Sequence, residues 1–342
     1  MKKKLFVAFR TFFFLGIGLF FIWYFLRNFT EEQKKEIYDS FLNADFSWFF
    51  ISIIVGILSH VFRGLRWMQM LAPMGYRPKK LNVMYAVFIG YLANLALPRL
   101  GEVSKCGVLA KYEKIPLNKG LGTIVTERVL DLIVLIILFS LTIALNFARL
   151  NQYFQEKVFI PLQQKFTALQ DTQFLLYFMM GSLVLFVVLL FLIRKYFPKH
   201  PWVLKIKHLI TGFWEGVSSL KNMKNPGLFI LYTFLIWFNY WLMTYIVFFS
   251  LKETSVLNAN AGLIVLMFGS IGMIVVQGGI GIYPAIVAET LLLFAIPEPI
   301  GYAYGWLVWV AQQLMIVTLG ALSFALLPIT NRNYTPTPHV QQ

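Results

Sequence analysis

The chain has 342 residues, of which 58% are hydrophobic and 17% aromatic, and its formal net charge is +15 at pH 7. Several apolar runs approach or exceed the length needed to cross a bilayer, so we predict an all-α polytopic integral membrane protein. Basic loops that face anionic lipid explain the positive charge, and we expect no nucleic-acid partner. The single cysteine, Cys106, excludes an intramolecular disulfide.

The N-terminal sequence MKKK, followed by an apolar run, is similar to a signal peptide. The run from Phe12 to Leu26 is bulky, however, and no A-x-A-like cleavage site follows it. We therefore predict a retained first helix that starts on the cytoplasmic side. Together with five later segments it gives six full spans, at roughly 9–26, 46–62, 129–147, 174–193, 227–250 and 301–327.

Two apolar stretches are interrupted, and we interpret both as re-entrant helical hairpins. The first, 83–112, opens with a run too short to cross about 30 Å of hydrocarbon, and then meets Pro98 and Gly101. Proline removes a helix donor, and glycine permits unusual backbone angles. The second stretch, 261–296, is broken at QGGIGIYP. A membrane tolerates such breaks only inside protein or beside a watery cavity.

The distribution of basic residues favours this topology. If both hairpins return to the side from which they enter, 23 of the 30 Lys and Arg residues fall on the cytoplasmic side, together with both termini. Each half then consists of span, span, hairpin and span, with the second half inverted, and Gly101 aligns with Gly281. We predict one domain over 1–328, with pseudo-repeats at about 1–150 and 151–328, and a disordered cytoplasmic tail over 329–342.

Charged residues at the first break are candidates for substrate binding. Arg99, Glu102 and Lys105 are spaced three apart, so they would share one face of a helix. Charge beside a break at membrane depth suggests a functional site, in which Arg99 would hold a lipid phosphate through two hydrogen bonds. The alternative is an internal ion pair that only stabilises the hairpin, and the two roles are compatible.

A second charged group, Glu127, Arg128 and Asp131, stands at the start of the span predicted over 129–147. Glu127 is explained by a first helical turn, where an acid complements the helix dipole. Asp131 is expected below the membrane surface, where pairing with a cation would offset its desolvation. Whether these residues bind substrate or stabilise the helix stays open.

The second break contributes the candidates Gln277, Gly278, Gly279, Gly281 and Tyr283. Three glycines in four residues allow a close approach of the backbone and leave amides free to bind an anion. The alternative is a tight turn without a binding role.

Arg63 and Arg66 close the second span, beside Trp67. Arginines that reach out to the interface, next to an interfacial aromatic, explain this pattern. The alternative is that these arginines contact a lipid head group. We expect His60 to be a residue of the helix end.

The sequence contains no Walker loop, H-E-x-x-H or G-x-S-x-G, and we predict no catalytic residue, no metal site and no cofactor. The order RGLRW, NLALPRLGEVSK, TERVLDLIVL and GGIGIYP resembles the lysylphosphatidylglycerol synthase transmembrane region, the flippase-like domain of the multiple peptide resistance factors, over about 50–327. Within it, P-R-x-G-E falls on Pro98–Glu102 and E-R-x-x-D on Glu127–Asp131. The resemblance implies a bacterial inner-membrane protein that moves a phospholipid, aminoacylated in full-length members, between leaflets.

Full-length synthases of this kind continue into a soluble transferase domain, whereas this sequence stops at Gln342, so we expect no synthesis of lysyl-lipid by this chain. Our leading expectation is a lipid translocase that is not an enzyme and that binds phospholipids. One alternative is a secondary transporter of a small solute or ion. Another is a membrane scaffold that docks a lipid-modifying synthase through the basic loop 194–226.

Overall fold

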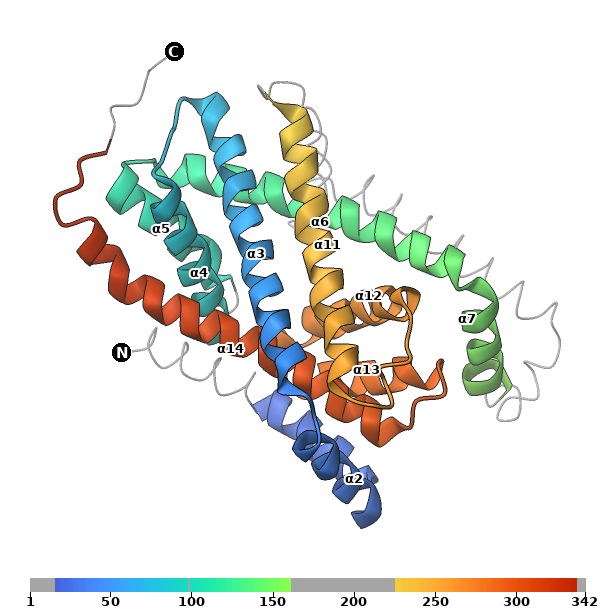
Figure 1. Cartoon of the computed structure of the whole chain (residues 1–342). Coiled ribbons are helices and arrows are strands. Elements are labelled where there is room, and N and C mark those ends of the chain that lie inside the picture. The colour runs from blue at the N-terminus through green and yellow to red at the C-terminus, as the bar shows by residue number, and fades with distance from the viewer. Residues whose placement is uncertain (1–15, 98, 161–224, 337–342) are drawn as a thin grey trace, which may run out of the picture. The chain divides into compact units, whose positions relative to one another are not determined.

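The computed structural model describes residues 16–97, 99–160 and 225–336 (Figure 1). These residues form helices and connecting turns, and no strand occurs among them, which confirms the predicted all-α class. Residues 16–28 are helical, and the remaining α-helices are α2 (Glu31–Leu42), α3 (Phe46–Leu71), α4 (Lys80–Ala96), α5 (Leu100–Glu113), α6 (Leu117–Leu145), α7 (Phe147–Phe154), α11 (Pro226–Val247), α12 (Ala259–Val275), α13 (Ile282–Leu292) and α14 (Glu298–Thr330).

Four described segments are long and apolar enough to cross a membrane, so the protein is an integral membrane protein. They are Phe46–Met74, Leu117–Leu145, Pro226–Ser250 and Glu298–Thr330. The predicted span 174–193 and basic loop 194–226 lie outside the described residues except for the last two positions of the loop, and the span 9–26 is described from residue 16. Exposed apolar side chains are frequent on the long helices, as lipid contact requires.

The chain divides into two compact units. The first comprises Met1–Glu127 and Leu220–Gln342, and the second comprises Arg128–Ser219. The candidate site and both helix breaks lie in the first unit.

α3 extends well beyond the span predicted over 46–62. Asp45 caps its first turn, because the carboxylate accepts a hydrogen bond from the Ser47 amide at 2.9 Å. The helix then continues to Leu71, so Arg63 and Arg66 lie within α3 and do not close a shorter span. Arginine is a good helix former, and arginines within membrane helices usually pair with other groups inside the protein.

α6 also begins earlier than predicted, at Leu117 instead of 129. Glu127 therefore lies in the third turn of the helix. A dipole effect fades within the first turn, so the proposed helix-start role of Glu127 is wrong.

The first predicted break lies between α4 and α5. Arg99 adopts a left-handed backbone with φ of 66°, a conformation that is strained for any residue with a Cβ. The two helices then approach closely: a Cβ on Gly101 would lie 2.1 Å from the Gly90 carbonyl oxygen. Asn94 closes the turn, because its side-chain oxygen accepts a hydrogen bond from the Gly101 amide at 2.7 Å.

The second predicted break lies between α12 and α13. Gly278, Gly279 and Gly281 all have positive φ, which glycine adopts without strain. The turn is held by the indole of Trp309 on α14, which donates to the Gly278 carbonyl at 2.6 Å. Residues 16–28 cover it, because a Cβ on Gly281 would lie 2.6 Å from the Gly18 carbonyl oxygen. A tight, covered turn is the role that this geometry supports for the glycines.

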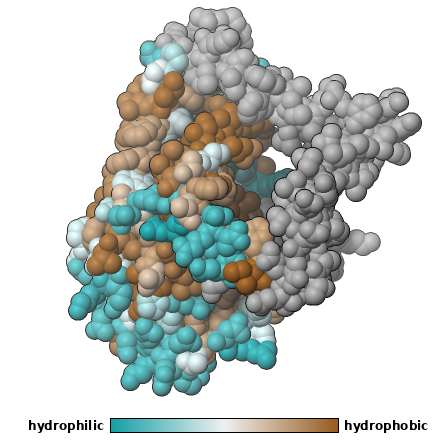
Figure 2. Space-filling model, turned by 90° about the vertical axis from the view of Figure 1, so that its right-hand side faces the viewer, coloured by the Kyte–Doolittle hydropathy of each residue, from teal (hydrophilic) through white to brown (hydrophobic). Residues whose placement is uncertain are grey.

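α3 and α11 lie side by side and run in opposite directions (Figure 1). α14 contacts α3, α4 and α13, so one long helix touches both broken pairs. Figure 2 shows hydrophobic residues over the upper and middle part of one face, around a hydrophilic patch, and hydrophilic residues gathered at its lower end. In Figure 1, α2 lies at that end. This helix follows the first apolar segment and carries an acidic first turn, Glu31 and Glu32.

The C-terminal segment packs against the outer ends of α4 and α5. The Asn331 side chain exchanges two hydrogen bonds with Asn82, at 2.7 and 2.9 Å. The Tyr334 hydroxyl donates to the buried carboxylate of Glu113 at 3.0 Å. A disordered tail was predicted from residue 329, but α14 continues to Thr330 and the segment up to 336 is described.

Candidate functional site: a buried cation cluster

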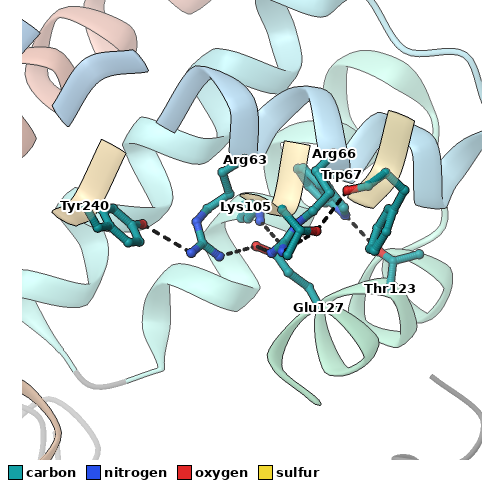
Figure 3. A network of polar contacts seen from close by, with 9 residues as sticks. Arg63, Arg66, Trp67, Lys105, Thr123, Glu127 and Tyr240 are labelled. Carbon is teal, nitrogen blue, oxygen red and sulfur yellow. Dashed lines mark hydrogen bonds and ion pairs between the residues drawn. The ribbon is translucent and has the colours of Figure 1, made fainter. Parts of the chain in front are cut away.

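Three cationic side chains converge on the carboxylate of Glu127 (Figure 3). Arg63 Nη1 lies 2.6 Å from Oε1, and Lys105 Nζ lies 2.9 Å from Oε2. The guanidinium of Arg66 contacts Oε1 at 3.5 Å. We call these four residues the cation cluster. Its members come from α3, α5 and α6, so the cluster ties the first hairpin to two long helices.

Polar groups of α11 extend the cluster on the other side. Arg63 Nη2 donates to the Tyr240 hydroxyl at 3.2 Å, and Arg66 Nη1 donates to Thr233 Oγ1 at 3.3 Å. The pairing of a later α3 residue with an earlier α11 residue follows from the antiparallel packing of the two helices. The arginines are therefore held between α6 and α11.

The ring of Trp67 flanks Lys105 of the cluster. Lys105 Nζ lies 4.2 Å from the centroid of the Trp67 ring, within the range of a cation–π contact. The Trp67 indole in turn donates to Thr123 on α6 at 2.8 Å. This bond fixes the ring, and through the ring it fixes the position of the ammonium.

The cluster lies well inside the helices that form it. Arg63 precedes the end of α3 by eight residues, or about 12 Å, and Glu127 follows the start of α6 by ten, or about 15 Å. The side chains of Arg63, Arg66 and Glu127 are exposed by 5%, 0% and 3%. Arginines that reach out to the interface were predicted here, and this interpretation is wrong, because Arg66 and Trp67 are fully buried.

The four side chains carry a formal net charge of +2. A buried ion needs a partner, because desolvation of each ion costs several kcal/mol even after relaxation. The carboxylate of Glu127, which all three cations contact, offsets part of this cost. An arrangement of this kind is suited to accept a further anion, and arginine and lysine are the side chains that bind phosphate most often.

The structure unites only some of the predicted site residues. Lys105 and Glu127 are brought together, and Arg63 and Arg66, expected at most to touch a head group, lie at the centre. Arg99 caps α5 with its left-handed backbone and is exposed, so it does not share a helical face with Glu102 and Lys105 as predicted. Glu102 lies one turn before Lys105 on α5.

The remaining candidates belong to the second unit or to the second helix break. Arg128 and Asp131 follow Glu127 on α6 but belong to the second unit. Gly278, Gly279 and Gly281 form the covered turn described above, and Gln277 opens that turn. Tyr283 is buried against α12, where a Cβ on Gly269 would lie 2.7 Å from its ring.

The sequence analysis did not predict Thr233 and Tyr240, the partners of the arginines on α11, or Thr123, the partner of Trp67. Thr233 and Tyr240 are polar residues inside an apolar span, and this polarity is the sequence feature that could have indicated a buried role. His60 was expected at a helix end, but it lies within α3 and is 1% exposed. Each of these side chains gains its role only from a neighbour that is far away in the sequence.

Parts of the chain are similar to known proteins. A region of 102 residues is 29% identical to "Glycosyltransferase AglD" of Haloferax volcanii, and covers 30% of this chain and 16% of that protein. A region of 93 residues is 30% identical to "UPF0104 membrane protein MJ1595" of Methanocaldococcus jannaschii, and covers 26% of this chain and 28% of that protein. The matches thus span less than a third of either relative, and no solved structure matches the chain significantly.

The family "Lysylphosphatidylglycerol synthase TM region" matches residues 11–320, which is nearly the whole chain. This range contains three of the four long helices, most of α14, both breaks and every member of the cation cluster. The resemblance seen in the sequence motifs is confirmed by this match: the protein is a membrane protein of the lysylphosphatidylglycerol synthase transmembrane-region family.

Proposed function

We propose that the protein moves a phospholipid between membrane leaflets and holds the lipid phosphate at the cation cluster. The observation that carries this proposal is the convergence of three cations, Arg63, Arg66 and Lys105, on the buried carboxylate of Glu127. A phosphodiester brings one negative charge and several acceptor oxygens, so it matches a group of guanidinium and ammonium donors where water is scarce. The family match supports a role at the lipid membrane.

Arg66 is the best placed of the three cations to receive a phosphate. Its contact with Glu127 is the longest of the three, 3.5 Å, and it also donates to the neutral hydroxyl of Thr233. Because Arg66 is fully buried, a substrate reaches it only after a movement of the surrounding helices. Lys105 belongs to the α4–α5 hairpin, so a shift of this hairpin would open the cluster and exchange the lysine contact for a substrate contact.

The fold supports a transport cycle of alternating access. We propose that α4–α5 and α12–α13 are re-entrant pairs within six full spans, related as inverted halves. The antiparallel packing of α3 and α11, which are corresponding spans of the two halves, supports this inversion. Transporters with paired broken helices bind their substrates between such halves, near the middle of the membrane.

We propose that the protein lies in a bacterial inner membrane with both termini on the cytoplasmic side. The charge distribution of the sequence supports cytoplasmic termini, and the resemblance supports a bacterial inner membrane. We propose no catalytic reaction for the chain, and phospholipids are its proposed partners. A lipid-modifying synthase that supplies the substrate is a further proposed partner.

The proposal is tested by transbilayer movement of lipid in proteoliposomes, using a fluorescent anionic phospholipid whose outer-leaflet copies are quenched chemically. Wild-type protein should accelerate movement over protein-free vesicles. Arg66→Gln removes one of three cations and should reduce the rate at least tenfold, while Arg77→Gln, the same change at an exposed position after α3, should not. Equal rates for wild-type and Arg66→Gln protein, both shown to be folded, would refute the proposal. Uptake of a soluble solute without any lipid movement would indicate a solute transporter instead.

A further inference from the structure

A second polar group lies next to the cation cluster, between α3, α4 and α11. His60 precedes Arg63 by three residues, so the two side chains share a face of α3. The His60 side chain is buried, and neither Nδ1 nor Nε2 has a hydrogen-bond partner among the described residues. The indole Nε1 of Trp237 is buried in the same way, again without a partner in the described part of the chain.

Tyr240 joins these atoms to the cluster. Its ring centroid lies 6.3 Å from that of His60 and 6.1 Å from that of Trp237. Its hydroxyl receives the hydrogen bond from Arg63. Phe88 and Tyr91 of α4 complete the surroundings of His60, at 5.8 and 4.4 Å between ring centroids. The histidine is thus enclosed by three aromatic rings.

The chemistry of this group indicates what it would bind. A neutral imidazole offers one donor and one acceptor, and an indole offers one donor. A buried polar atom without a partner costs about 1–3 kcal/mol, so such atoms in a membrane protein point to a ligand or to water. The cations of the cluster lie one turn away and would repel a cationic group. An uncharged hydroxyl, which both donates and accepts, matches the available atoms, and aromatic rings suit the carbons that carry it.

Building on the proposed function, we propose that His60 and Trp237 bind hydroxyl groups of the same lipid head group whose phosphate is held by the cation cluster. One helical turn separates His60 from Arg63, about 4.5 Å along the axis. A hydroxyl carried two or three bonds beyond a phosphate ester spans a similar distance. The site would therefore select phospholipids with a hydroxylated head group over equally charged lipids without one.

A competition between two lipids tests this selectivity. Protein in neutral detergent is mixed with equal amounts of phosphatidylglycerol and phosphatidylpropanol, which have the same charge and acyl chains and differ by two hydroxyl groups. Native mass spectrometry measures the ratio of the two bound lipids. Wild-type protein should favour phosphatidylglycerol by roughly tenfold, as expected from the loss of one buried hydrogen bond.

Single substitutions then assign the preference to the two residues. His60→Phe keeps a ring but removes both nitrogen atoms, and should bring the ratio to within roughly twofold of unity. Trp237→Phe removes the indole N–H and should lower the ratio in the same direction. Trp241→Phe is the matched control on α11, since the Trp241 indole donates to the Ala259 carbonyl at 3.0 Å and has no place in this group. It should keep the wild-type ratio.

The outcomes separate this inference from the proposal on which it rests. Equal binding of both lipids by wild-type protein, with loss of both in Arg66→Gln, would overturn the hydroxyl site and leave the phosphate site intact. An unchanged preference in both His60→Phe and Trp237→Phe would also overturn it. If one of the two variants fails to fold, an unchanged ratio in the other is sufficient to reject the role of its residue. Failure of wild-type protein to bind either lipid would overturn both proposals.

Discussion

Replacement of Glu127 by glutamine should destabilise the protein severely, although the two side chains have nearly the same shape. The change removes the only negative charge of the cation cluster and leaves Arg63, Arg66 and Lys105 buried together. At an effective dielectric constant of about 20, contacts of 2.6, 2.9 and 3.5 Å correspond to gross attractions of roughly 5–6 kcal/mol each. Desolvation and repulsion among the cations cancel most of this sum. Removal of one partner from a buried ion pair costs about 3–5 kcal/mol, and we expect Glu127→Gln to reach that range.

The assay is thermal unfolding of purified protein in detergent, followed by size-exclusion chromatography of the fraction that stays folded. Glu127→Gln should lower the unfolding midpoint by roughly 10 °C. Glu31→Gln is the matched control, because it removes the same charge from the exposed pair of Glu31 with Lys34 at 2.7 Å. A surface pair contributes about 1 kcal/mol at most, so the control should stay close to the wild-type midpoint.

A double-mutant cycle shows whether the loss arises from uncompensated charge. Lys105→Met in the Glu127→Gln background removes one of the three cations and should recover part of the lost stability. Contacting residues in one ionic network show coupling energies of about 0.5–3 kcal/mol. An unchanged midpoint for Glu127→Gln, or additive losses in the double mutant, would refute the account of the cluster as a buried ionic network that depends on Glu127.

Three further predictions concern the first hairpin and the C-terminal segment. Arg99→Gly relieves the strain of a left-handed backbone and should stabilise the protein by up to about 1 kcal/mol in the same unfolding assay. Arg99→Ala keeps a Cβ and should not stabilise it. A loss of stability in Arg99→Gly would contradict the strained turn. Gly101→Ala should lower the unfolding midpoint by several degrees, because its Cβ would meet the facing backbone of α4. Gly107→Ala on the same helix should be tolerated, because nothing lies within 4 Å of the added Cβ. Equal effects of the two substitutions would show that the helices do not approach this closely. Burial and the Glu113 carboxylate raise the pKa of Tyr334. The hydrogen bond between Tyr334 and Glu113 should therefore persist below the ordinary tyrosine pKa of about 10 and be lost as the pH rises through the raised value. Faster hydrogen exchange of residues 331–336 should accompany this loss, and Tyr334→Phe should remove the pH dependence.

Local sequence signals predicted the helix breaks and most of the long helices. Proline and glycine act on the backbone where they stand, so the interruption near Arg99 and the glycine turn at Gly278 could be placed from the sequence alone. The apolar run that forms α11 is as clear, because its composition is sufficient to define a span. In contrast, α6 was predicted to start twelve residues late, since the segment from Leu117 to Glu127 mixes polar and glycine residues with apolar ones.

The centre of the candidate site could not be predicted, because it depends on tertiary pairing. Arg63 and Arg66 have the sequence pattern of interfacial arginines, and only the position of Glu127, more than sixty residues later, makes their burial favourable. The spacing of Arg99, Glu102 and Lys105 suggested one helical face, but the left-handed backbone at Arg99 takes this residue out of the helix. Charge at a break led to Lys105, which belongs to the cation cluster, but not to Arg63 and Arg66.

The most direct test of the account is the rate at which wild-type protein, reconstituted alone, moves an anionic phospholipid across the bilayer. We predict movement that is faster than in protein-free vesicles and that slows at least tenfold in Arg66→Gln but not in Arg77→Gln. The same rate in vesicles with and without folded wild-type protein would contradict the proposal that the buried cation cluster serves lipid translocation.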